Sequence, residues 1–485
     1  MKPLTTGRVA GSAERTPSAR WALASLSLSM LMPSLDTSIA NAGLPALALA
    51  FNASFQAVQW IVLAYLLAIT TLIVSVGRLG DIIGRRTLLL GGIGLFTLAS
   101  LACGVAPTLP VLIVARAVQG LGAAIMMSLT VALVGETVPK GRIGSAMGLL
   151  GTMSAIGTTL GPSMGGILIA GPGWRTIFLI NVPLGILNLL LAQRCLPPDV
   201  LTEVEAPART PFDAIGTLLL ALTLAAYALA MTIGRGNFGP LNVGLLFAAV
   251  IAVGLFVFVE SRAASPVIRL TMFRDPRLTP RLAMSALVST VMMATLVVGP
   301  FYLARGLGLQ TAIVGLVLSV GPLVAALAGV PAGRVVDRLG TQRMTLIGLG
   351  GIAAGSSILS MLPATFGVLG YVLPVVVITA GYALFQAANS SAIMTAIPPD
   401  QRGVIAGLLS LSRNLGLITG ASVMGAVFAF GSSASDITTA GAEAVGAGMR
   451  FTFGVAGVLI TVAMALAFVR IRSDSLPSHV EVTAR

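Results

Sequence analysis

Long apolar stretches separated by short polar turns run through this chain from end to end. Each stretch approaches the roughly 20 residues that a helix needs to cross the hydrocarbon core of a bilayer. The pattern predicts fourteen such helices, near residues 21–42, 57–77, 86–106, 109–134, 143–170, 174–194, 213–233, 241–260, 280–303, 311–332, 343–362, 369–395, 403–430 and 448–471. We therefore expect an all-α polytopic membrane protein whose two chain ends lie on the same side of the membrane.

The distribution of charge predicts which side this is. Hydrophobic residues make up 56% of the chain and charged residues 9%, against about 25% charged in an average soluble domain. The loops on one side hold most of the Lys and Arg residues, and those on the other side contain Arg175, Arg235, Arg305 and Arg450. Because basic residues favour cytoplasmic loops, we expect cytoplasmic termini and a bacterial cell membrane. Orientation and lipid head groups account for the net charge of +13, so no nucleic-acid partner is expected.

A short motif occurs twice and divides the chain into two related halves. Residues 77–86, after the second predicted span, resemble residues 333–343, after the tenth. Repeats of this kind are typical of transporters. The predicted units are a cytoplasmic tail at 1–20, a six-helix bundle at 21–195, a linker at 196–212, two extra helices with their following loop at 213–265, a second six-helix bundle at 266–472 and a tail at 473–485.

One carboxylate, Asp36, lies in the middle of an otherwise uncharged apolar stretch from Trp21 to Leu49. Ionisable residues inside membrane spans are costly and usually functional. Burial disfavours the charged form of a carboxylate and contact with water favours it, so an acid exposed alternately to both sides can carry a proton. A hydrogen bond to Ser38 or Asn41 within the same helix is the alternative explanation.

Arg116 also falls within a predicted span. A cation at that depth costs about 2.5–3.5 kcal/mol on insertion scales, so it requires a compensating group or a water-filled cavity. The residues alone leave open whether Arg116 takes part in proton transfer, or is a structural ion pair or a clamp on backbone carbonyls.

A row of glycines is the third candidate feature. Gly157, Gly161 and Gly165 are spaced by four residues, which places them in one stripe along a helix and allows close approach of a neighbouring backbone. Pro162 removes a hydrogen bond and loosens the same helix. With Gly148 and Gly166, this set is a candidate gate, and plain helix packing is the alternative.

Together these motifs resemble the fourteen-helix drug/proton antiporters of the major facilitator superfamily, and the resemblance covers nearly the whole chain. The matching segments are 35–45, 77–86, 116–124, 148–166 and 174–185. The resemblance implies two pseudo-symmetric six-helix bundles plus two additional helices. The 148–166 segment is similar to an antiporter signature that uptake members generally lack, and it implies export.

The resemblance also implies roles for individual residues. Asp36 and Arg116 are expected to carry proton coupling. The repeated loop is expected to form a conformational latch that holds the outward-facing state, made of Gly77, Asp81, Gly84, Arg85, Arg86, Asp337 and Arg338.

A substrate cavity is expected to combine aromatic surfaces with a few polar groups, because such surfaces adapt to varied ligands and attract cations. The candidates are Asn41, Gln59, Trp60, Tyr65, Gln119, Tyr382, Gln386 and Asn389. Contact with lipid or with neighbouring helices is the alternative for each of them.

These features predict a proton-coupled antiporter that exports lipophilic compounds by alternating access. A single central acid suits monocationic or zwitterionic substrates. A dedicated exporter of an endogenous metabolite and, less favoured, a proton-coupled uptake symporter are the alternatives. No phosphate-binding GxxxxGK[ST] motif and no metal or nucleophile constellation occurs in the sequence. We therefore expect no enzyme activity and no cofactor; the partners are a small-molecule substrate, protons and membrane lipids, with no obligate protein partner evident.

Overall fold

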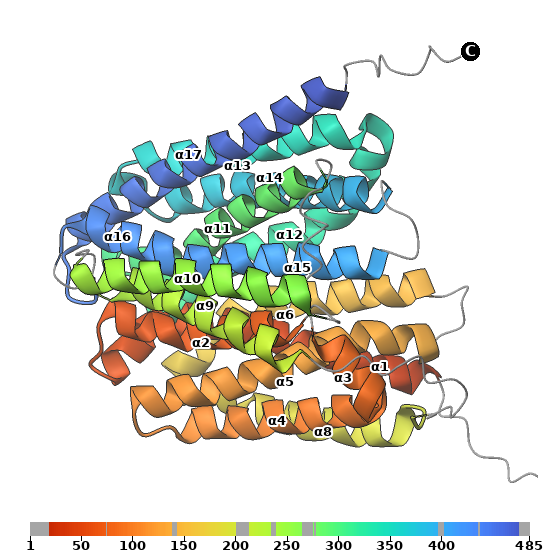
Figure 1. Cartoon of the computed structure of the whole chain (residues 1–485). Coiled ribbons are helices and arrows are strands. Elements are labelled where there is room, and N and C mark those ends of the chain that lie inside the picture. The colour runs from red at the N-terminus through yellow and green to blue at the C-terminus, as the bar shows by residue number, and fades with distance from the viewer. Residues whose placement is uncertain are drawn as a thin grey trace, which may run out of the picture.

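The computed structural model describes residues 19–73, 75–137, 143–199, 213–233, 239–263, 275, 278–395, 402–434 and 437–474, and every regular element in these ranges is helical. Figure 1 shows the arrangement. The elements are α1 (Ala19–Ala50), α2 (Phe55–Ile73), α3 (Val76–Ile83), α4 (Arg85–Val105), α5 (Leu109–Thr137), α6 (Ile143–Ala170), α7 (Thr176–Leu179), α8 (Asn181–Cys195), α9 (Ala214–Thr232), α10 (Pro240–Arg262), α11 (Thr279–Phe301), η3 (Tyr302–Gly306), α12 (Thr311–Leu339), α13 (Thr341–Met361), η4 (Ala364–Phe366), α14 (Gly367–Thr395), α15 (Arg402–Thr419), η6 (Gly420–Met424), α16 (Gly425–Ser432) and α17 (Ala442–Asp474).

Within the described part of the chain, thirteen helical segments are long and apolar enough to cross a membrane. α1 is not one of them, although its 32 residues are long enough to span. Its buried polar residues, which include several serines, Asp36 and Asn41, lower its overall hydropathy. With α1, every one of the fourteen expected spans coincides with a helix or a run of helices. The fold is that of an all-α, multi-pass membrane protein.

The helix boundaries differ from the expected ones at several points. α1 continues to Ala50, well beyond the expected end at residue 42. The second span ends at Ile73, and the chain turns there into the short helix α3 instead of continuing to residue 77. The sixth span is divided at Ile180 into α7 and α8, and α12 extends beyond residue 332 to Leu339. Hydropathy marks the apolar centre of each span and not its polar ends, so these boundaries were not visible in the sequence.

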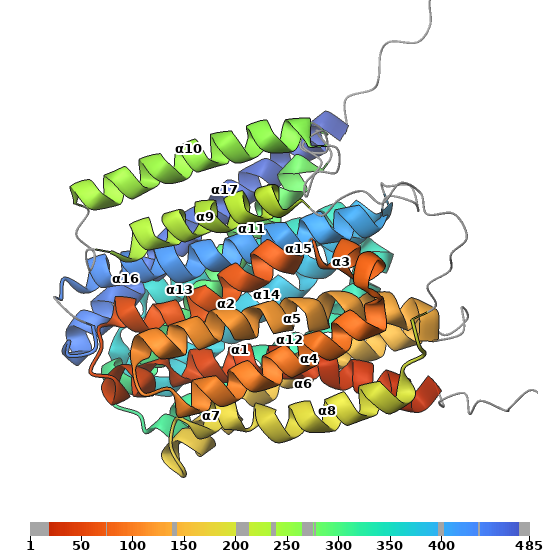
Figure 2. The same ribbon diagram turned by 60° about the horizontal axis from the view of Figure 1, so that its bottom comes forward.

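Two helical bundles lie side by side, with a helical hairpin beside them (Figures 1 and 2). Helices α1 to α8 form the first bundle and α11 to α17 form the second. α1 begins and α17 ends at the same end of the molecule, on the right in Figure 1. We call this the Arg20 end, and the opposite end, where α2 begins, the Phe55 end.

The loop repeated in the sequence has the same backbone form in both halves. Gly84 lies between α3 and α4 with φ of 102°, and Gly340 lies between α12 and α13 with φ of 86°. This left-handed region is accessible to glycine at little cost. The two loops therefore make equivalent turns, as expected for two related halves.

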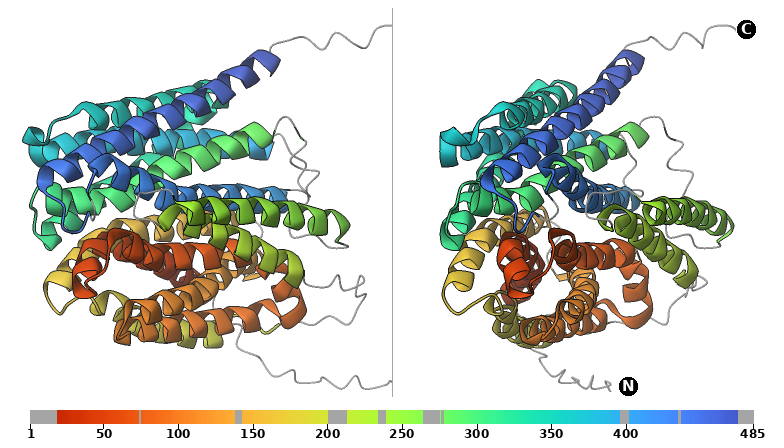
Figure 3. Two further views of the ribbon diagram at one scale, coloured as in Figure 1. Left: turned by 60° about the vertical axis from the view of Figure 1, so that its left-hand side comes forward. Right: turned by 90° about the vertical axis from the view of Figure 1, so that its left-hand side faces the viewer.

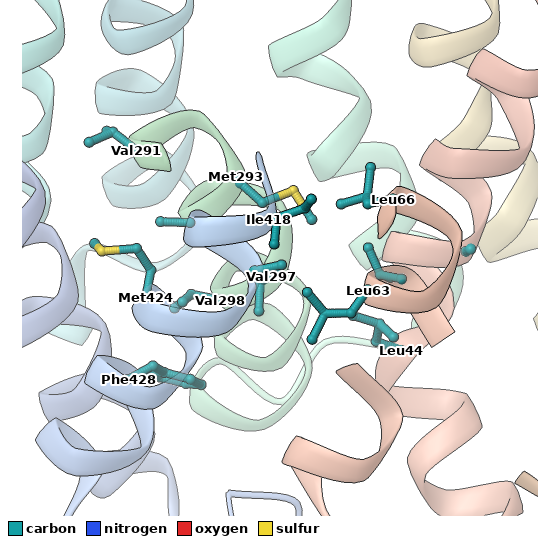
Figure 4. Close-up of a cluster of buried hydrophobic side chains, with 14 of the residues drawn as sticks. Leu44, Leu63, Leu66, Val291, Met293, Val297, Val298, Ile418, Met424 and Phe428 are labelled. Carbon is teal, nitrogen blue, oxygen red and sulfur yellow. The ribbon is translucent and has the colours of Figure 1, made fainter. Parts of the chain in front are cut away.

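The bundles meet at the Phe55 end. Phe55 of α2 packs edge-on against Phe301 of α11 and Phe428 of α16, with ring centroids 4.7 and 5.6 Å apart. Figure 4 shows the same junction, where Leu63 on α2 faces Val297 on α11. Gln59 Nε2 adds a hydrogen bond to the carbonyl oxygen of Ala421 at 2.9 Å. The apolar cores of the two bundles are continuous at this end.

Toward the Arg20 end, the cores are separate. Buried residues of the first bundle there form their own cluster, which includes Leu26, Ile69 and Leu133. A small cluster of the second bundle, Val336 with Met344 and Ala388, is distinct from it. The end-on view in Figure 3, which looks from the Phe55 end, shows the helices of the first bundle below those of the second. The protein is therefore closed at the Phe55 end, and its bundles have independent cores at the other end.

Helix α6 belongs to the first bundle but packs on both. A methyl group added at Gly157 would lie 2.7 Å from the carbonyl oxygen of Leu31 on α1, and one added at Gly166 would lie 2.8 Å from that of Thr311 on α12. Gly315 on α12 makes a second close contact with α6, because a methyl group there would overlap the carbonyl oxygen of Pro162. The glycines let backbones approach without side chains between them.

The hairpin α9–α10 is attached mainly to the first bundle. Its inner helix α9 makes two side-chain hydrogen bonds with the α2–α3 segment and one with α15. The three pairs are Ser75 Oγ with Thr217 Oγ1 (3.1 Å), Trp60 Nε1 with Thr232 Oγ1 (3.0 Å) and Tyr227 Oη with Thr419 Oγ1 (3.3 Å). α10 packs on α9 and exposes most of its apolar side chains, so it is the helix of the hairpin whose apolar surface is available to lipid.

The α6–α12 contact predicts the effect of one methyl group. Gly315→Ala should destabilise the protein by about 1–3 kcal/mol, because the added carbon forces two backbones apart. Gly329→Ala on the same helix meets nothing within 4 Å, so it should leave stability unchanged or slightly raised. Thermal unfolding in detergent measures both, and equal melting temperatures would contradict the proposed close contact.

Candidate functional site

The two charged residues predicted within the membrane form an ion pair inside the first bundle. Arg116 Nη1 on α5 donates to Asp36 Oδ2 on α1 at 2.5 Å. Asp36 is 1% exposed and Arg116 is fully buried. A buried ion pair of this kind requires good geometry and further hydrogen bonds to offset the loss of hydration.

Amide side chains from two other positions supply those hydrogen bonds. Gln119, one turn after Arg116 on α5, accepts from Arg116 Nη1 at 2.6 Å and donates to Asp36 Oδ1 at 2.9 Å. Asn181, the first residue of α8, donates to the same Oδ1 at 2.8 Å. Ser100 on α4 accepts from Gln119 Nε2 at 2.7 Å. Side chains of α5 and α8 thus bond to the carboxylate on α1, and α4 supports Gln119 from behind.

The guanidinium of Arg116 is held from other directions as well. Its Nε donates to the carbonyl oxygen of Ile61 on α2 at 3.0 Å. Its central carbon lies 4.2 Å from the centroid of the Tyr65 ring and 5.7 Å from that of Phe178. Aromatic faces attract a cation, and more strongly away from water. The ion pair and the backbone clamp considered for Arg116 are therefore both present.

Two polar atoms of this site have no hydrogen-bond partner in the structure. They are Arg116 Nη2 and Asn181 Oδ1, and both are buried. Each can form a bond that the present arrangement does not use. The site consequently has hydrogen-bonding capacity for a second arrangement.

The other predicted cavity residues of the first bundle face in different directions. Tyr65 packs on Arg116 and Gln119 belongs to the ion-pair network. Asn41 donates to the carbonyl oxygen of Thr37 in its own helix. Gln59 reaches across to the second bundle and Trp60 to α9. The structure therefore brings Tyr65 and Gln119 to Asp36 and directs Gln59 and Trp60 elsewhere.

The predicted cavity residues of the second bundle are all on α14. Tyr382 and Gln386 are half-buried. Asn389 is fully buried and donates to the carbonyl oxygen of Arg281 at 3.3 Å. Their spacing places them on one face of the helix, in the other bundle from the ion pair.

The glycines of the predicted gate lie where α6 crosses α1. A methyl group at Gly161 would overlap the Ser38 side chain, and one at Gly165 would touch Ile39. Gly166 and Pro162 lie against α12. The surroundings of Gly148 lie outside the described part of the structure. This surface of α6 therefore contacts the helix that carries Asp36 and the opposite bundle at once.

The predicted latch is partly visible at the Arg20 end. Gly77 is exposed, as are Asp337 and Arg338 on α12. The side chain of Asp81 lies outside the described residues. Arg85 is half-buried, and Arg86 Nη2 donates to the carbonyl oxygen of Gln193 on α8 at 2.7 Å. The described contact of Arg86 is thus within its own bundle.

Asp199, which no motif indicated, completes this loop. Its carboxylate accepts from the backbone N–H groups of Arg86 at 2.8 Å and Thr87 at 3.0 Å, and from Thr87 Oγ1 at 2.7 Å. Carboxylates at a helix N-terminus satisfy free N–H groups and interact favourably with the helix dipole. A side chain at Gly84 would collide with Asp199, so glycine is needed there for contact as well as for backbone conformation.

Sequence reasoning did not assign roles to Asn181, Ser100 and Gly315. Asn181 lies in the 174–185 segment that carries the family resemblance, and that position was its only signal. Ser100 and Gly315 are common residue types in membrane helices, so only their three-dimensional neighbours distinguish them. Among the described residues, no group of three His, Cys, Asp or Glu side chains could hold a metal ion.

Comparison with known proteins shows that the relatives of this chain are membrane transporters. A family model described as Major Facilitator Superfamily matches residues 26–421. The chain is 32% identical to the multidrug resistance protein Stp of Mycobacterium tuberculosis over 413 residues, covering 83% of this chain and 74% of Stp. It is 31% identical to the drug efflux pump JefA of the same species, with 85% and 81% covered. It is 30% identical to the riboflavin transporter RibZ of Clostridioides difficile, with 83% and 86% covered.

Solved structures show a similar fold. A bacterial homologue of the human lysosomal transporter Spinster, in an inward-facing and unoccupied conformation, matches with a TM-score of 0.67 and 15% identity over 96% of this chain and 98% of that chain. A mutant form of the nucleoside transporter NupG matches with a TM-score of 0.65 and 13% identity over 93% and 99%.

Two related helical bundles, the first with a buried ion pair inside it, together with these relatives define a membrane transporter of small molecules and not an enzyme. The chain belongs to the Major Facilitator Superfamily.

The ion pair predicts a non-additive effect on stability. Arg116→Met should destabilise the protein by about 3–5 kcal/mol, because it leaves Asp36 buried without a counter-charge. Adding Asp36→Asn to this variant should restore much of the loss. Thermal unfolding of the two single variants and the double variant gives the coupling energy, and strictly additive effects would contradict a direct interaction.

The contacts of Asp199 predict a pH-dependent contribution to the stability of the folded protein. Partial burial raises the pKa of its carboxyl, but the hydrogen bonds from Thr87 and Arg86 and the charge of Arg86 outweigh this and lower the pKa below its usual value. The stabilisation is therefore present at neutral pH and lost as the pH falls through the acid range below about 4. Asp199→Asn should lower the melting temperature at pH 7 and have progressively less effect in acid, whereas Asp337→Asn, at an exposed position, should have none.

Proposed function

We propose that this protein is a proton-coupled antiporter that exports lipophilic, monocationic or zwitterionic compounds by alternating access. The observation that carries the proposal is the buried carboxylate of Asp36, which has the cation Arg116 and two amide donors around it. Multidrug resistance protein Stp and drug efflux pump JefA, both at least 31% identical, support drug export as the activity.

Asp36 is the group that takes up and releases the coupled proton. In its ionised form it neutralises Arg116. When it is protonated, Arg116 loses its counter-charge and keeps the carbonyl of Ile61, the Gln119 oxygen and the Tyr65 ring. Uptake of a proton therefore changes the balance of contacts among α1, α2, α5 and α8.

Helix α6 transmits this change to the seam between the bundles. A methyl group at Gly157 would lie 2.9 Å from the Leu35 nitrogen, next to Asp36. The same helix contacts α12 through Gly166 and Pro162. A shift of α1 that follows proton uptake would thus act on a close contact between the two bundles, which must open for the other side to become accessible.

We propose further that the Arg20 end faces the cytoplasm of a bacterial cell. Arg20, Arg85, Arg338 and Arg343 lie in the helix ends at that end of the molecule, and basic segments favour the cytoplasm. The closed Phe55 end then faces outward, so the conformation described here is inward-facing. Export would proceed by binding from the cytoplasm or inner leaflet and release after the Phe55 end opens.

The membrane potential can drive the exchange of one proton for a zwitterion, because this exchange moves one net charge. It contributes about 2.3 kcal/mol per charge per 100 mV, which corresponds to roughly fifty-fold in concentration. The exchange of one proton for a monocation moves no net charge, so the pH difference across the membrane drives it.

A dedicated exporter of an endogenous metabolite is the second candidate. The relative RibZ, named a riboflavin transporter, is 30% identical over most of both chains and shows that this level of similarity also occurs with a specific transporter. A narrow specificity would use the same proton-coupling site with a more selective cavity.

Efflux of ethidium from cells that express the protein tests the proposal. The parent should lower intracellular ethidium several-fold, a protonophore should abolish this, and Asp36→Asn should reduce efflux to the level of cells without the protein. Asp36→Glu should retain part of the activity. Glu443→Gln, which removes an exposed carboxylate, serves as the matched control and should behave as the parent.

The alternatives give different results. A well-expressed parent that does not move ethidium would favour the metabolite exporter. Efflux that survives the protonophore, or that survives Asp36→Asn, would contradict proton coupling through Asp36.

A further inference from the structure

We infer that Asn181 is the residue that exchanges its hydrogen bond with Asp36 when that carboxylate takes up a proton, donating to the ionised form and accepting from the protonated form. This makes Asn181 a positioning residue for proton coupling, and the inference rests on the role proposed above for Asp36.

The position of the proton follows from the two sides of the carboxylate. Oδ2 faces Arg116 Nη1 at 2.5 Å, and a guanidinium can only donate hydrogen bonds. Oδ1 faces two amide nitrogens, Gln119 Nε2 at 2.9 Å and Asn181 Nδ2 at 2.8 Å. An amide also carries an acceptor, so the proton is accommodated at Oδ1 if one of these two amides turns its oxygen toward Asp36.

Gln119 is fixed in its present orientation. Its nitrogen also donates to Ser100 Oγ at 2.7 Å, and its oxygen accepts from Arg116 Nη1 at 2.6 Å and from Cys103 Sγ at 3.6 Å. Turning this amide would place its N–H groups against the guanidinium. It would break every one of these contacts.

Asn181 has no such restraint. Its Oδ1 is buried and has no hydrogen-bond partner, and a buried acceptor without a partner is costly. A half-turn of the amide places this oxygen against Oδ1 of Asp36, where it accepts the new O–H. Asn181 then forms a hydrogen bond with Asp36 in both protonation states of the carboxylate, as donor to the ionised form and as acceptor from the protonated form. The acceptor that has no partner in the present structure is the one that the protonated form uses.

A second asparagine on the same helix provides a matched control. Asn188 is also fully buried and also bonds to α1, but both of its amide atoms are in use: Oδ1 accepts from Ser25 Oγ at 2.9 Å and Nδ2 donates to Ser29 Oγ at 2.8 Å. Its partners do not titrate. Asn188→Leu therefore removes a similar contact without affecting the carboxylate.

Infrared difference spectroscopy of the purified, lipid-reconstituted protein tests the inference without a substrate. The carbonyl band of protonated Asp36, identified by its loss in Asp36→Asn, is followed as a function of pH. In Asn181→Leu its midpoint should move to higher pH by about 0.5–1 unit, because the ionised form loses a charge-assisted bond that is stronger than the neutral one lost by the acid. Asn188→Leu should leave the midpoint unchanged.

The half-turn of the Asn181 amide should give a separate infrared signal. In the parent labelled at the asparagine side-chain carbonyl, one amide band should shift together with the Asp36 band, and it should persist in Asn188→Leu. The amide band of the labelled parent tests the half-turn of Asn181 even if Asn181→Leu does not fold. An unchanged midpoint in Asn181→Leu, an equal shift in Asn188→Leu, or no pH-linked amide band would overturn the inference.

Failure of the proposed function and failure of the inference about Asn181 give different combinations of efflux and infrared results. If ethidium efflux resists the protonophore while the infrared midpoint moves in Asn181→Leu, antiport is wrong and the role of Asn181 stands. If efflux depends on protons and on Asp36 while the midpoint does not move, the proposed function stands and Asn181 is only structural.

Discussion

The buried pair of Asp36 and Arg116 sets the conditions for the rest of the first bundle. Taking both charges out of water is costly, and the cost is offset only where each lone pair and each N–H finds a partner. Polar side chains on α4, α5 and α8 and a carbonyl on α2 supply most of these partners, and Arg116 Nη2 is left without one. The pair therefore determines how these helices face one another.

The same requirement explains why the polar residues of the first bundle are concentrated in its interior. α1 carries buried serines along with Asp36, and its contacts with α8 include the Asn188 bonds to Ser25 and Ser29. In a membrane, such bonds substitute for the hydrophobic effect between helices. On the opposite side of α1, the glycine stripe of α6 packs closely on the α1 backbone, and Ser34 Oγ lies 2.7 Å from Ser154 Oγ of α6. α1 is thus held by polar contacts on one face and by close backbone packing on the other.

Much of this organisation could be predicted from the sequence. The number and positions of the spans follow from hydropathy, and Asp36, Arg116 and the glycine row stand out because they are rare or regularly spaced in such helices. Directions of side chains could not be predicted in the same way. Trp60 faces α9 because of how an inserted hairpin packs, and Asp199 caps α4 through a contact 112 residues away in sequence. The π-helical turns η3 and η6 depend on tertiary contacts as well.

The placement of α9 affects how a lipid-soluble compound can reach the interior. α9 packs against α2 and η6, along the side of the seam where α2 and α15 meet, and on the other side α6 and α12 are in backbone contact. In the orientation proposed above, a molecule dissolved in the outer leaflet therefore meets protein on both sides of the seam near the Phe55 end. Partitioning into the bilayer alone gives it no sideways route at that level. If the proposed export of lipophilic compounds holds, the inner leaflet is the reservoir from which such a compound is collected.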